Sequence, residues 1–326
     1  MNNRGMLDLV ISLLPGLKIK DRIYLLQAFN SEEDILIQTK RNVEEILEHE
    51  LKEYWDINEV FERAGHIDTV CRTRSIKWVS YTDGNYPPLL REMYDPPSVI
   101  YYKGILPNPE KSLLGMVGTR KPSPEASEQA YKIAGNLSRM GISIISGLAL
   151  GIDAMSHRGS LIGGAPGYAV LGSGIDEVYP SMNKPLAKRI LDSGGALISE
   201  YTPGTHPDKW TFPARNRIIA GFSRSVLIVE APKKSGALIT AGFTLEQGKD
   251  IWVASSGIEE SAKFDKSGTL KLAQDGAEII SSAKDVLDKW NIVNANDFSR
   301  EREELAFGEN RGELISTIAG FLKIDI

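Results

Sequence analysis

The sequence predicts an α/β protein: a doubly wound, mostly parallel sheet preceded by a small all-helical domain. Two observations support this. From residue 112 onward, short apolar runs rich in β-branched residues end in glycine or an acid, and they alternate with helical stretches. Near-continuous apolar strands that alternate with helices are typical of a parallel sheet covered on both faces. Before residue 80, the apolar residues instead cluster at helical spacing.

Residues 1–80 are expected to form several short helices. One of them ends at Pro15-Gly16, and Ser31 has the character of a helix N-cap. The turn at residues 14–17 is interpreted as a plain helix stop, in preference to a helix-hairpin-helix turn that holds a DNA phosphate. The N-terminal part is therefore expected to be a small helical domain.

The α/β part is expected to span residues 113–290, after an extended junction at 81–112 that is rich in proline, glycine and tyrosine. Its seven expected strands are 113–117, 142–145, 168–171, 196–199, 226–229, 251–254 and 278–280. A doubly wound sheet of this kind is Rossmann-like, and its crossovers are expected to be right-handed. Residues 291–326 are acidic with one amphipathic stretch, and they are interpreted as a docked helix or a tail.

The turns that follow the expected strands predict a phosphate-binding rim. In such sheets ligands bind beyond the carboxyl ends of the strands. Glycine lets a ligand approach the backbone closely, and a helix N-terminus offers free N–H groups to an anion. Four of the first five strands end in turns that combine glycine or serine with the start of a helix. The candidate rim residues in these turns are Gly118, Ser146, Gly147, Gly172, Gly174, Ser235 and Gly236.

Basic residues fall at the same edge of the expected sheet. They and one amide are Arg120, Lys121, Lys184, Arg215, Asn216 and Arg217. Trp210 and Phe212 lie beside the last three residues. Aromatic rings can stack on bases while guanidinium groups hold phosphates, a combination that single-strand binders use. The alternative, that both aromatic side chains belong to the core, stays equally open.

Composition excludes several other classes of protein. The 326 residues carry 38 Lys+Arg against 43 Asp+Glu, a net charge of -5, which argues against indiscriminate coating of DNA. Residues 113–290 alone hold 20 basic and 18 acidic residues, so the α/β part is mildly basic. A single cysteine, Cys71, excludes an intramolecular disulfide framework. No apolar run approaches the roughly 18 residues of a membrane span, so we expect a cytoplasmic protein with no membrane partner.

Catalytic and cofactor motifs are scarce. The sequence contains neither the GxGxxG of a dinucleotide site nor the GxxxxGK[ST] of a P-loop. None of the four histidines has metal-ligand spacing to another histidine or to the cysteine, and no G-x-S-x-G turn occurs. We therefore expect no catalytic residues, no metal and no cofactor.

Five motifs occur in order and together indicate a family. They are Gly118-Thr119-Arg120; residues 146–153, with Ser-Gly-Leu-Ala and Gly-Ile-Asp; residues 169–180, which end in Tyr-Pro; residues 212–221, with Phe-Pro and Arg-Asn-Arg; and residues 235–241, Ser-Gly-Ala-Leu-Ile-Thr-Ala. With a proline-rich entry at 86–104, this set closely resembles the DNA-processing protein A (DprA, or Smf) family over about residues 84–288.

This resemblance implies an extended Rossmann fold, preceded by a sterile-alpha-motif-like (SAM-like) domain and often followed by a winged helix. Family members bind single-stranded DNA in a basic pocket and form homodimers. They help load the RecA recombinase onto DNA displaced from single-strand-binding protein, in natural transformation and recombination, and they need no cofactor. The resemblance matches Arg120 and Lys184 to family positions in the glycine-x-arginine and tyrosine-proline turns, and Arg215 and Arg217 to the arginine-asparagine-arginine segment.

The sequence departs from the family pattern at three places. Leu270 replaces a usual asparagine, residues 163–168 differ at the glycine-to-strand junction, and the 36 residues after Trp290 are too few for a winged helix. The alternative function is a nucleotide-binding or nucleotide-hydrolysing protein related to the cytokinin-activating phosphoribohydrolases. Their proline-glycine-glycine-x-glycine-threonine turn is not present at residues 234–240.

Overall fold

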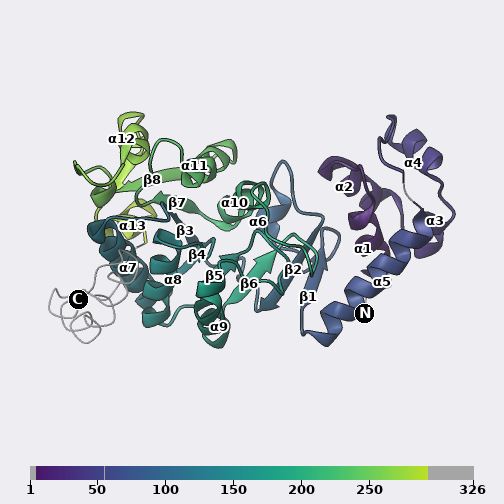
Figure 1. Ribbon diagram of the computed structural model, residues 1–326, viewed down its shortest axis with the longest axis horizontal. Coiled ribbons are helices and arrows are strands. Elements are labelled where there is room, and N and C mark those ends of the chain that lie inside the picture. Colours follow the sequence, from purple (N-terminus) through teal and green to yellow (C-terminus); the bar gives the residue numbers. More distant parts are fainter. Residues whose placement is uncertain (1–4, 55, 293–326) are drawn as a thin grey trace.

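The computed structural model describes residues 5–54 and 56–292. The molecule is elongated, with a group of helices at one end and a helix-covered sheet that fills the rest (Figure 1). The acidic segment predicted at 291–326, with its amphipathic stretch, lies outside the described residues apart from its first two. Within the described ranges, no helix combines the length and the apolar character that crossing a membrane requires.

Five helices form the N-terminal group, which we call the helical module. They are α1 (Gly5–Leu13), α2 (Ile19–Ala28), α3 (Glu32–Leu36), α4 (Lys40–Leu47) and α5 (Ile57–Thr73). Ser31 caps α3 as predicted, since its hydroxyl accepts a hydrogen bond from the Asp34 backbone N–H. Leu14 and Leu17 are buried around Gly16, which has a φ of 73°. Gly16 itself is exposed between these leucines, and the interpretation of the turn as a plain helix stop stays a prediction.

The described residues form one nine-stranded sheet with the order β1-β2-β6-β5-β4-β3-β7-β8-β9. The seven predicted strands are all present, with ends displaced by no more than one residue: β3 (Leu113–Val117), β4 (Ser143–Ser146), β5 (Tyr168–Val170), β6 (Ala196–Ser199), β7 (Ser225–Ile228), β8 (Asp250–Ala254) and β9 (Glu278–Ile280). These seven pair in parallel, which confirms the predicted doubly wound α/β fold.

Two further strands were not predicted. β1 (Lys77–Ser80) pairs antiparallel with β2 (Val99–Gly104), which pairs antiparallel with β6. β1 thus lies within residues 1–80, which were expected to be helical throughout. β2 and the short helix α6 (Pro88–Arg91) lie in the expected junction at 81–112. β1 has only four residues at the sheet edge, and the prolines around β2 hid the strand within a turn-like composition.

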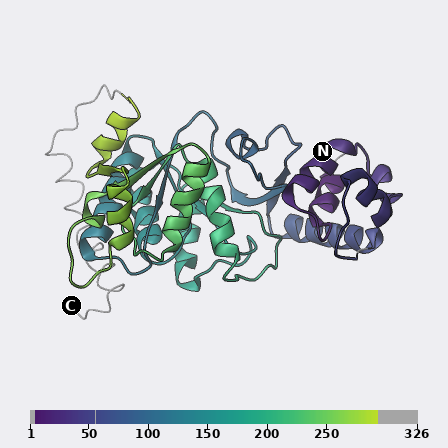
Figure 2. The same ribbon diagram turned by 90° about the horizontal axis from the view of Figure 1, so that it is seen from above.

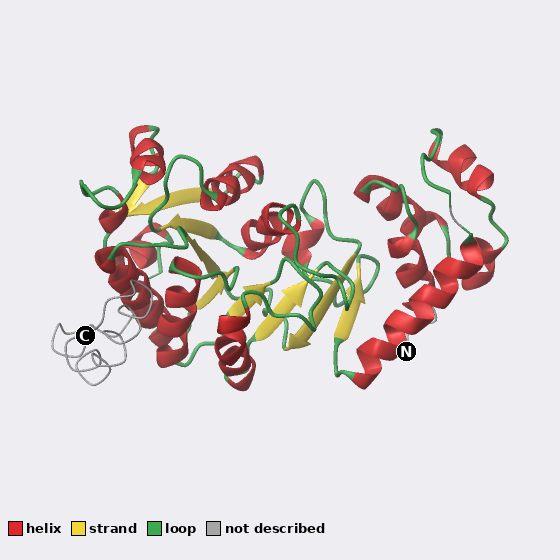
Figure 3. Ribbon diagram, viewed as in Figure 1, coloured by secondary structure: helices red, strands yellow, loops and turns green. Residues whose placement is uncertain are grey.

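Helices cover both faces of the sheet (Figures 2 and 3). One face packs against α7 (Pro124–Arg139), α8 (Ile152–Gly163) and α13 (Ala283–Lys289), and the opposite face packs against α10 (Thr211–Phe222) and α11 (Gly236–Glu246). Alternate residues of β3 serve the two cores: Leu114 and Met116 face the first layer, and Leu113 and Val117 face the second. The remaining helical segments are α9 (Lys184–Asp192), α12 (Ser267–Gln274), and the 3-10 turns η1 (Ser181–Asn183) and η2 (Ser255–Gly257).

The strand order reverses at the boundary between β3 and β7. From β3 the chain proceeds outward through β4, β5 and β6, and it then crosses back by α10 to β7 on the other side of β3. Adjacent loops that leave in opposite directions open a crevice at such a switch point, and ligands bind there in doubly wound sheets. The fold therefore directs attention to the turns that follow β3 and β7.

Candidate nucleic-acid interface

A cleft of about 740 Å³ lies at the switch point between β3 and β7. Its walls come from the turn after β3, the turn after β7, and the start of α10 with the loop before it. Seven of the thirteen residues predicted as binding residues line it: Gly118, Arg120, Lys121, Arg215, Asn216, Ser235 and Gly236. An eighth, Gly147, lines a small pocket that adjoins the cleft and shares Arg120, Tyr179 and Phe212 with it.

Exposed cations and aromatic rings share the mouth of the cleft. Arg120 and Lys121 are exposed after β3, and the Arg120 guanidinium lies 5.6 Å from the centre of the Phe212 ring. The Phe212 ring in turn lies 5.4 Å from the ring of Tyr179. Trp210, with 73% of its surface exposed, lies under the Lys209 ammonium at 5.0 Å. The interpretation of Trp210 as a core residue is therefore wrong.

The N-terminus of α11 opens onto the cleft beside these rings. The Ser235 hydroxyl accepts a hydrogen bond from the Ala237 backbone N–H, which caps the helix. Gly236 is exposed at the first helical position, and its carbonyl accepts a hydrogen bond from the Asn216 side chain. The backbone dipoles of an eleven-residue helix place partial positive charge at this end. The exposed Lys234 adds a full positive charge at the same place.

Arg215 forms the floor of the cleft and is used internally. It is 4% exposed, and Nη1 donates to the carbonyl oxygens of Gly147, at 2.7 Å, and of Val170. Burial lowers the pKa of the Arg215 guanidinium to about 10, and the attraction of Asp153 opposes that shift. A Cβ at residue 147 would lie 2.6 Å from Arg215 Nη2, so this position requires glycine. Arg215 therefore braces β4 and β5 from below the cleft.

Two backbone donors of the turn after β4 are occupied by a side chain of the protein itself. The Asp153 carboxylate already accepts hydrogen bonds from the backbone N–H groups of Gly147, at 3.1 Å, and Ala149, at 3.3 Å. Burial raises the pKa of Asp153, whereas Arg215 and these donors oppose the rise. The Ser146 hydroxyl is fully buried and donates to the Met116 carbonyl. The Ser146 hydroxyl and the Gly147 N–H thus both make internal contacts, and their predicted contact with phosphate stays a prediction.

The remaining predicted residues are not among those that line the cleft. The Arg217 guanidinium is buried and pairs with Glu200 at 2.6 Å and with Asp95 at 2.9 Å, which raises the pKa of Arg217. Gly172 packs against Phe212, and the Gly174 N–H donates to the Thr205 carbonyl. Lys184 is exposed at the first position of α9. Among these, only Lys184 has a charge free to meet a ligand at the surface.

Sequence reasoning missed two cations and an aromatic ring of the cleft. Lys209, Lys234 and Tyr179 line the cleft but were not among the predicted binding residues. Lys234 lies in the turn after a predicted strand, and Lys209 adjoins Trp210, so both carried a positional signal. Two acids, Asp153 and Asp208, also line the cleft; the Asp153 carboxylate is buried, and the Asp208 carboxylate accepts a hydrogen bond from the Trp210 N–H. The four exposed lysine and arginine side chains therefore leave the mouth positively charged.

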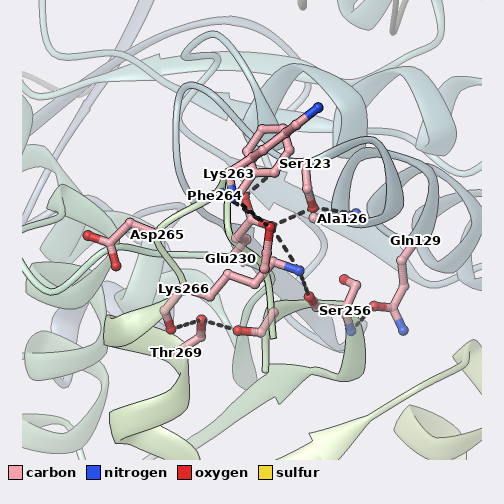
Figure 4. A network of polar contacts seen from close by, with 12 residues as sticks. Ser123, Ala126, Gln129, Glu230, Ser256, Lys263, Phe264, Asp265, Lys266 and Thr269 are labelled. Carbon is pink, nitrogen blue, oxygen red and sulfur yellow. Dashed lines mark hydrogen bonds and ion pairs between the residues drawn. The ribbon is translucent and has the colours of Figure 1, made fainter. Parts of the chain in front are cut away.

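A buried network fixes the turn that carries Arg120 (Figure 4). The Glu230 carboxylate, at the end of β7, accepts hydrogen bonds from the Ser123 backbone N–H at 2.9 Å and the Ser123 hydroxyl at 2.6 Å. Lys266 Nζ lies 3.7 Å from the same carboxylate and donates to the Ser256 carbonyl at 2.7 Å. The Thr119 N–H donates to the Glu230 carbonyl at 2.7 Å. The two turns at the switch point are thus held together.

Among residues 5–54 and 56–292, no group of three or more His, Cys, Asp or Glu side chains is placed to hold a metal ion.

Leu270, which departs from the family pattern, is 42% exposed on α12. Leu270 therefore presents an apolar side chain where family members usually have an asparagine, which could make a polar contact.

Known proteins resemble this chain in both sequence and structure. A family model described as DNA recombination-mediator protein A matches residues 77–291. Protein Smf of Synechocystis is 40% identical over 241 residues, which are 72% of this chain and 59% of that protein. DNA processing protein DprA of Bacillus subtilis is 35% identical over 237 residues, which are 72% of this chain and 78% of that protein. The match thus spans about three fifths of the Synechocystis relative.

Two solved structures extend the comparison. The crystal structure of DprA from Streptococcus pneumoniae has a TM-score of 0.69 and 30% sequence identity, with 89% of this chain and 98% of that chain covered. DNA processing protein A from Helicobacter pylori, described for its unique single-stranded DNA binding mode, has a TM-score of 0.57 and 24% identity over 66% of this chain and 95% of that one. At that identity the second likeness concerns the fold alone. Because the family model covers most of the chain, this protein belongs to the DNA recombination-mediator protein A family, whose curated members are named DprA and Smf.

Proposed function

We propose that this protein binds single-stranded DNA across the cleft between β3 and β7. The observation that carries the proposal is the shared mouth of exposed cations and aromatic rings. Four cations, Arg120, Lys121, Lys209 and Lys234, line one cleft together with the Phe212 ring. Cations that follow the backbone and rings that stack on bases are what non-specific single-strand binding requires.

The contacts divide by chemistry. Arg120 offers a planar, multidentate donor to a phosphate, and the α11 N-terminus offers backbone N–H groups to another. Phe212 and Tyr179 offer ring faces to bases on the same side. Lys184 meets the strand where it leaves the cleft past Tyr179. Because these contacts read charge and stacking rather than base edges, little sequence preference is expected.

Arg215 and Arg217 support the interface from within. Both guanidinium groups are buried and engaged by protein groups, so we assign them to positioning α10 rather than to phosphate contact. Asn216 holds α10 to the first residue of α11. The Arg215-Asn216-Arg217 segment thereby keeps the two sides of the cleft at a fixed separation.

In the cell, we propose that the protein acts as a recombination mediator without catalysing a reaction. It helps load the RecA recombinase onto single-stranded DNA displaced from single-strand-binding protein, during natural transformation and recombination. It works as a homodimer in the cytoplasm and uses no cofactor. Family membership and the DNA-processing names of the relatives support this role.

A mobility-shift comparison of single- and double-stranded oligonucleotides tests the binding proposal. The wild type should prefer the single strand. Arg120→Glu should weaken binding at least about tenfold, because a charge-assisted hydrogen bond contributes about 1.5–3 kcal/mol. Arg41→Glu on α4, an exposed cation far along the chain from the cleft turns, is the matched control. Equal binding of the wild type and Arg120→Glu would remove the proposed interface.

A further inference from the structure

The end of the helical module is linked to two loops that contribute residues to the cleft. We call these the rim loops: residues 171–180, after β5, and residues 200–210, after β6. The first contributes Tyr179 to the cleft, and the second contributes Lys209. Neither loop belongs to the module, so contacts between module and loops connect two separate parts of the fold.

Asp176 links the module to both rim loops. Arg74, which directly follows α5, places Nη1 2.5 Å from Asp176 Oδ2. The other oxygen, Asp176 Oδ1, accepts a hydrogen bond from the Gly204 N–H at 2.9 Å. The Asp176 side chain is only 12% exposed. One shielded carboxylate thus joins the end of α5, the first rim loop and the second rim loop.

Glu200, the first residue of the second rim loop, is held from α10. Its Oε2 accepts a hydrogen bond from Arg217 Nη2 at 2.6 Å, whereas its Oε1 is buried without a hydrogen bond. Arg22 of α2 donates from Nη2 to the Leu14 carbonyl at 3.2 Å, within the module, and forms no ion pair with Glu200. The polar link between the module and the second rim loop therefore passes through Asp176.

The module is also packed firmly enough for such links to position the loops. Its buried leucines form one apolar cluster with side chains of the sheet and of α9, such as Tyr101 on β2, Leu197 on β6 and Leu186 on α9. Apolar packing of this kind is not easily deformed. Arg74 is therefore presented to the first rim loop from a firmly packed module.

We infer that the helical module positions the rim loops for single-stranded DNA through Asp176, which makes Arg74 a positioning residue for DNA binding. Arg74 does not line the cleft. The inference rests on the proposed function, since it concerns the same cleft. It assigns to the module a role in DNA affinity that does not require the module to touch DNA.

The test compares the salt dependence of binding for full-length variants, by fluorescence anisotropy with a labelled oligothymidylate. The variant Arg74→Gln should bind about fivefold more weakly at every salt concentration, the lower end of typical coupling between two sites. Its slope of log K against log salt should equal that of the wild type. Removal of one direct phosphate interaction would instead reduce the slope by about 0.7.

Matched variants separate positioning from a general loss of charge. Arg41→Gln removes one cation from α4, where Arg41 pairs with Glu45 one turn away in the module. This control should bind like the wild type. Arg74→Lys keeps the charge and should restore most of the affinity. The lysine variant also allows the inference to be tested if the glutamine variant does not fold. Thermal unfolding of each variant checks that the compared proteins are folded.

Three outcomes would overturn the inference. The glutamine variant could bind like the wild type at every salt concentration, its slope could fall by about 0.7 as for a direct phosphate contact, or the α4 control could lose as much affinity. Failure of the lysine variant to restore binding would also count against it. If the wild type shows no salt-dependent binding of single strands, the proposed function fails and this inference fails with it.

Discussion

Replacement of Glu230 by alanine should destabilise the fold at the point where the two sides of the cleft meet. The Glu230 carboxylate is 1% exposed, accepts two hydrogen bonds from Ser123, and lies 3.7 Å from Lys266 Nζ. Its removal leaves the Ser123 N–H and the buried ammonium without their anionic partner. Removal of one partner of a buried ion pair costs about 3–5 kcal/mol. We expect a decrease of this size in the free energy of unfolding.

Equilibrium urea unfolding, followed by tryptophan fluorescence, measures the effect. Glu278→Ala is the control, because the Glu278–Lys289 pair is about half exposed on the surface. Surface pairs contribute about 0–1 kcal/mol, so the control should remain close to the wild type. Glu230→Gln keeps an acceptor for Ser123 and should fall between the two. If Glu230→Ala unfolds within about 1 kcal/mol of the control, the network does not hold the switch-point turns as described.

Three further predictions concern the floor of the cleft, the pH dependence of stability and base stacking. Arg215→Met leaves the Gly147 carbonyl and Asp153 without their buried partner, so the free energy of unfolding should fall by about 3–5 kcal/mol in urea titrations. Burial lowers the pKa of His157 to about 3, so the unfolded chain, with a histidine pKa near 6.5, binds its proton more tightly. Stability should therefore fall as the pH drops from about 6.5 towards 3, and calorimetry of His157→Gln should show a weaker decline over that range. Trp210→Ala should lose about 1–3 kcal/mol of single-strand binding energy in anisotropy titrations if the exposed ring stacks on a base. Unchanged binding would leave Trp210 without a role in the interface.

The sequence was sufficient for the strands that are buried on both faces. Their apolar runs mark them because each side chain packs against one helical layer or the other, as Leu113 and Leu114 do on β3. β1 and β2 were not predicted because their pairing is antiparallel and depends on β6, whose position no local sequence pattern reveals. Local composition describes what a segment can pack against, but it does not reveal which distant strand completes the pair.

The candidate site was likewise predictable where it depends on the ends of the parallel strands, but not where it depends on distant partners. Turns after β3 and β7 were identified because strand exits in parallel sheets converge, and these exits do form the cleft around Arg120 and Gly236. The sequence could not show that Asp95 and Glu200 would bury the charge of Arg217. Nor could it show that the Asp153 carboxylate would accept hydrogen bonds from the Gly147 and Ala149 N–H groups after β4. These partners come from distant segments, so charge alone did not distinguish a supporting arginine from a surface one.

The salt dependence of oligonucleotide binding tests the central claim most directly. If the exposed cations of the cleft hold phosphates, log K for the wild type falls linearly with log salt. Arg120→Glu, Lys209→Glu and Lys234→Glu should each reduce that slope by about 0.7 for every phosphate that is no longer neutralised, whereas Arg41→Glu should leave it unchanged. A wild-type slope near zero, or three cleft variants with the same slope as the wild type, would contradict the assignment of this cleft to single-stranded DNA.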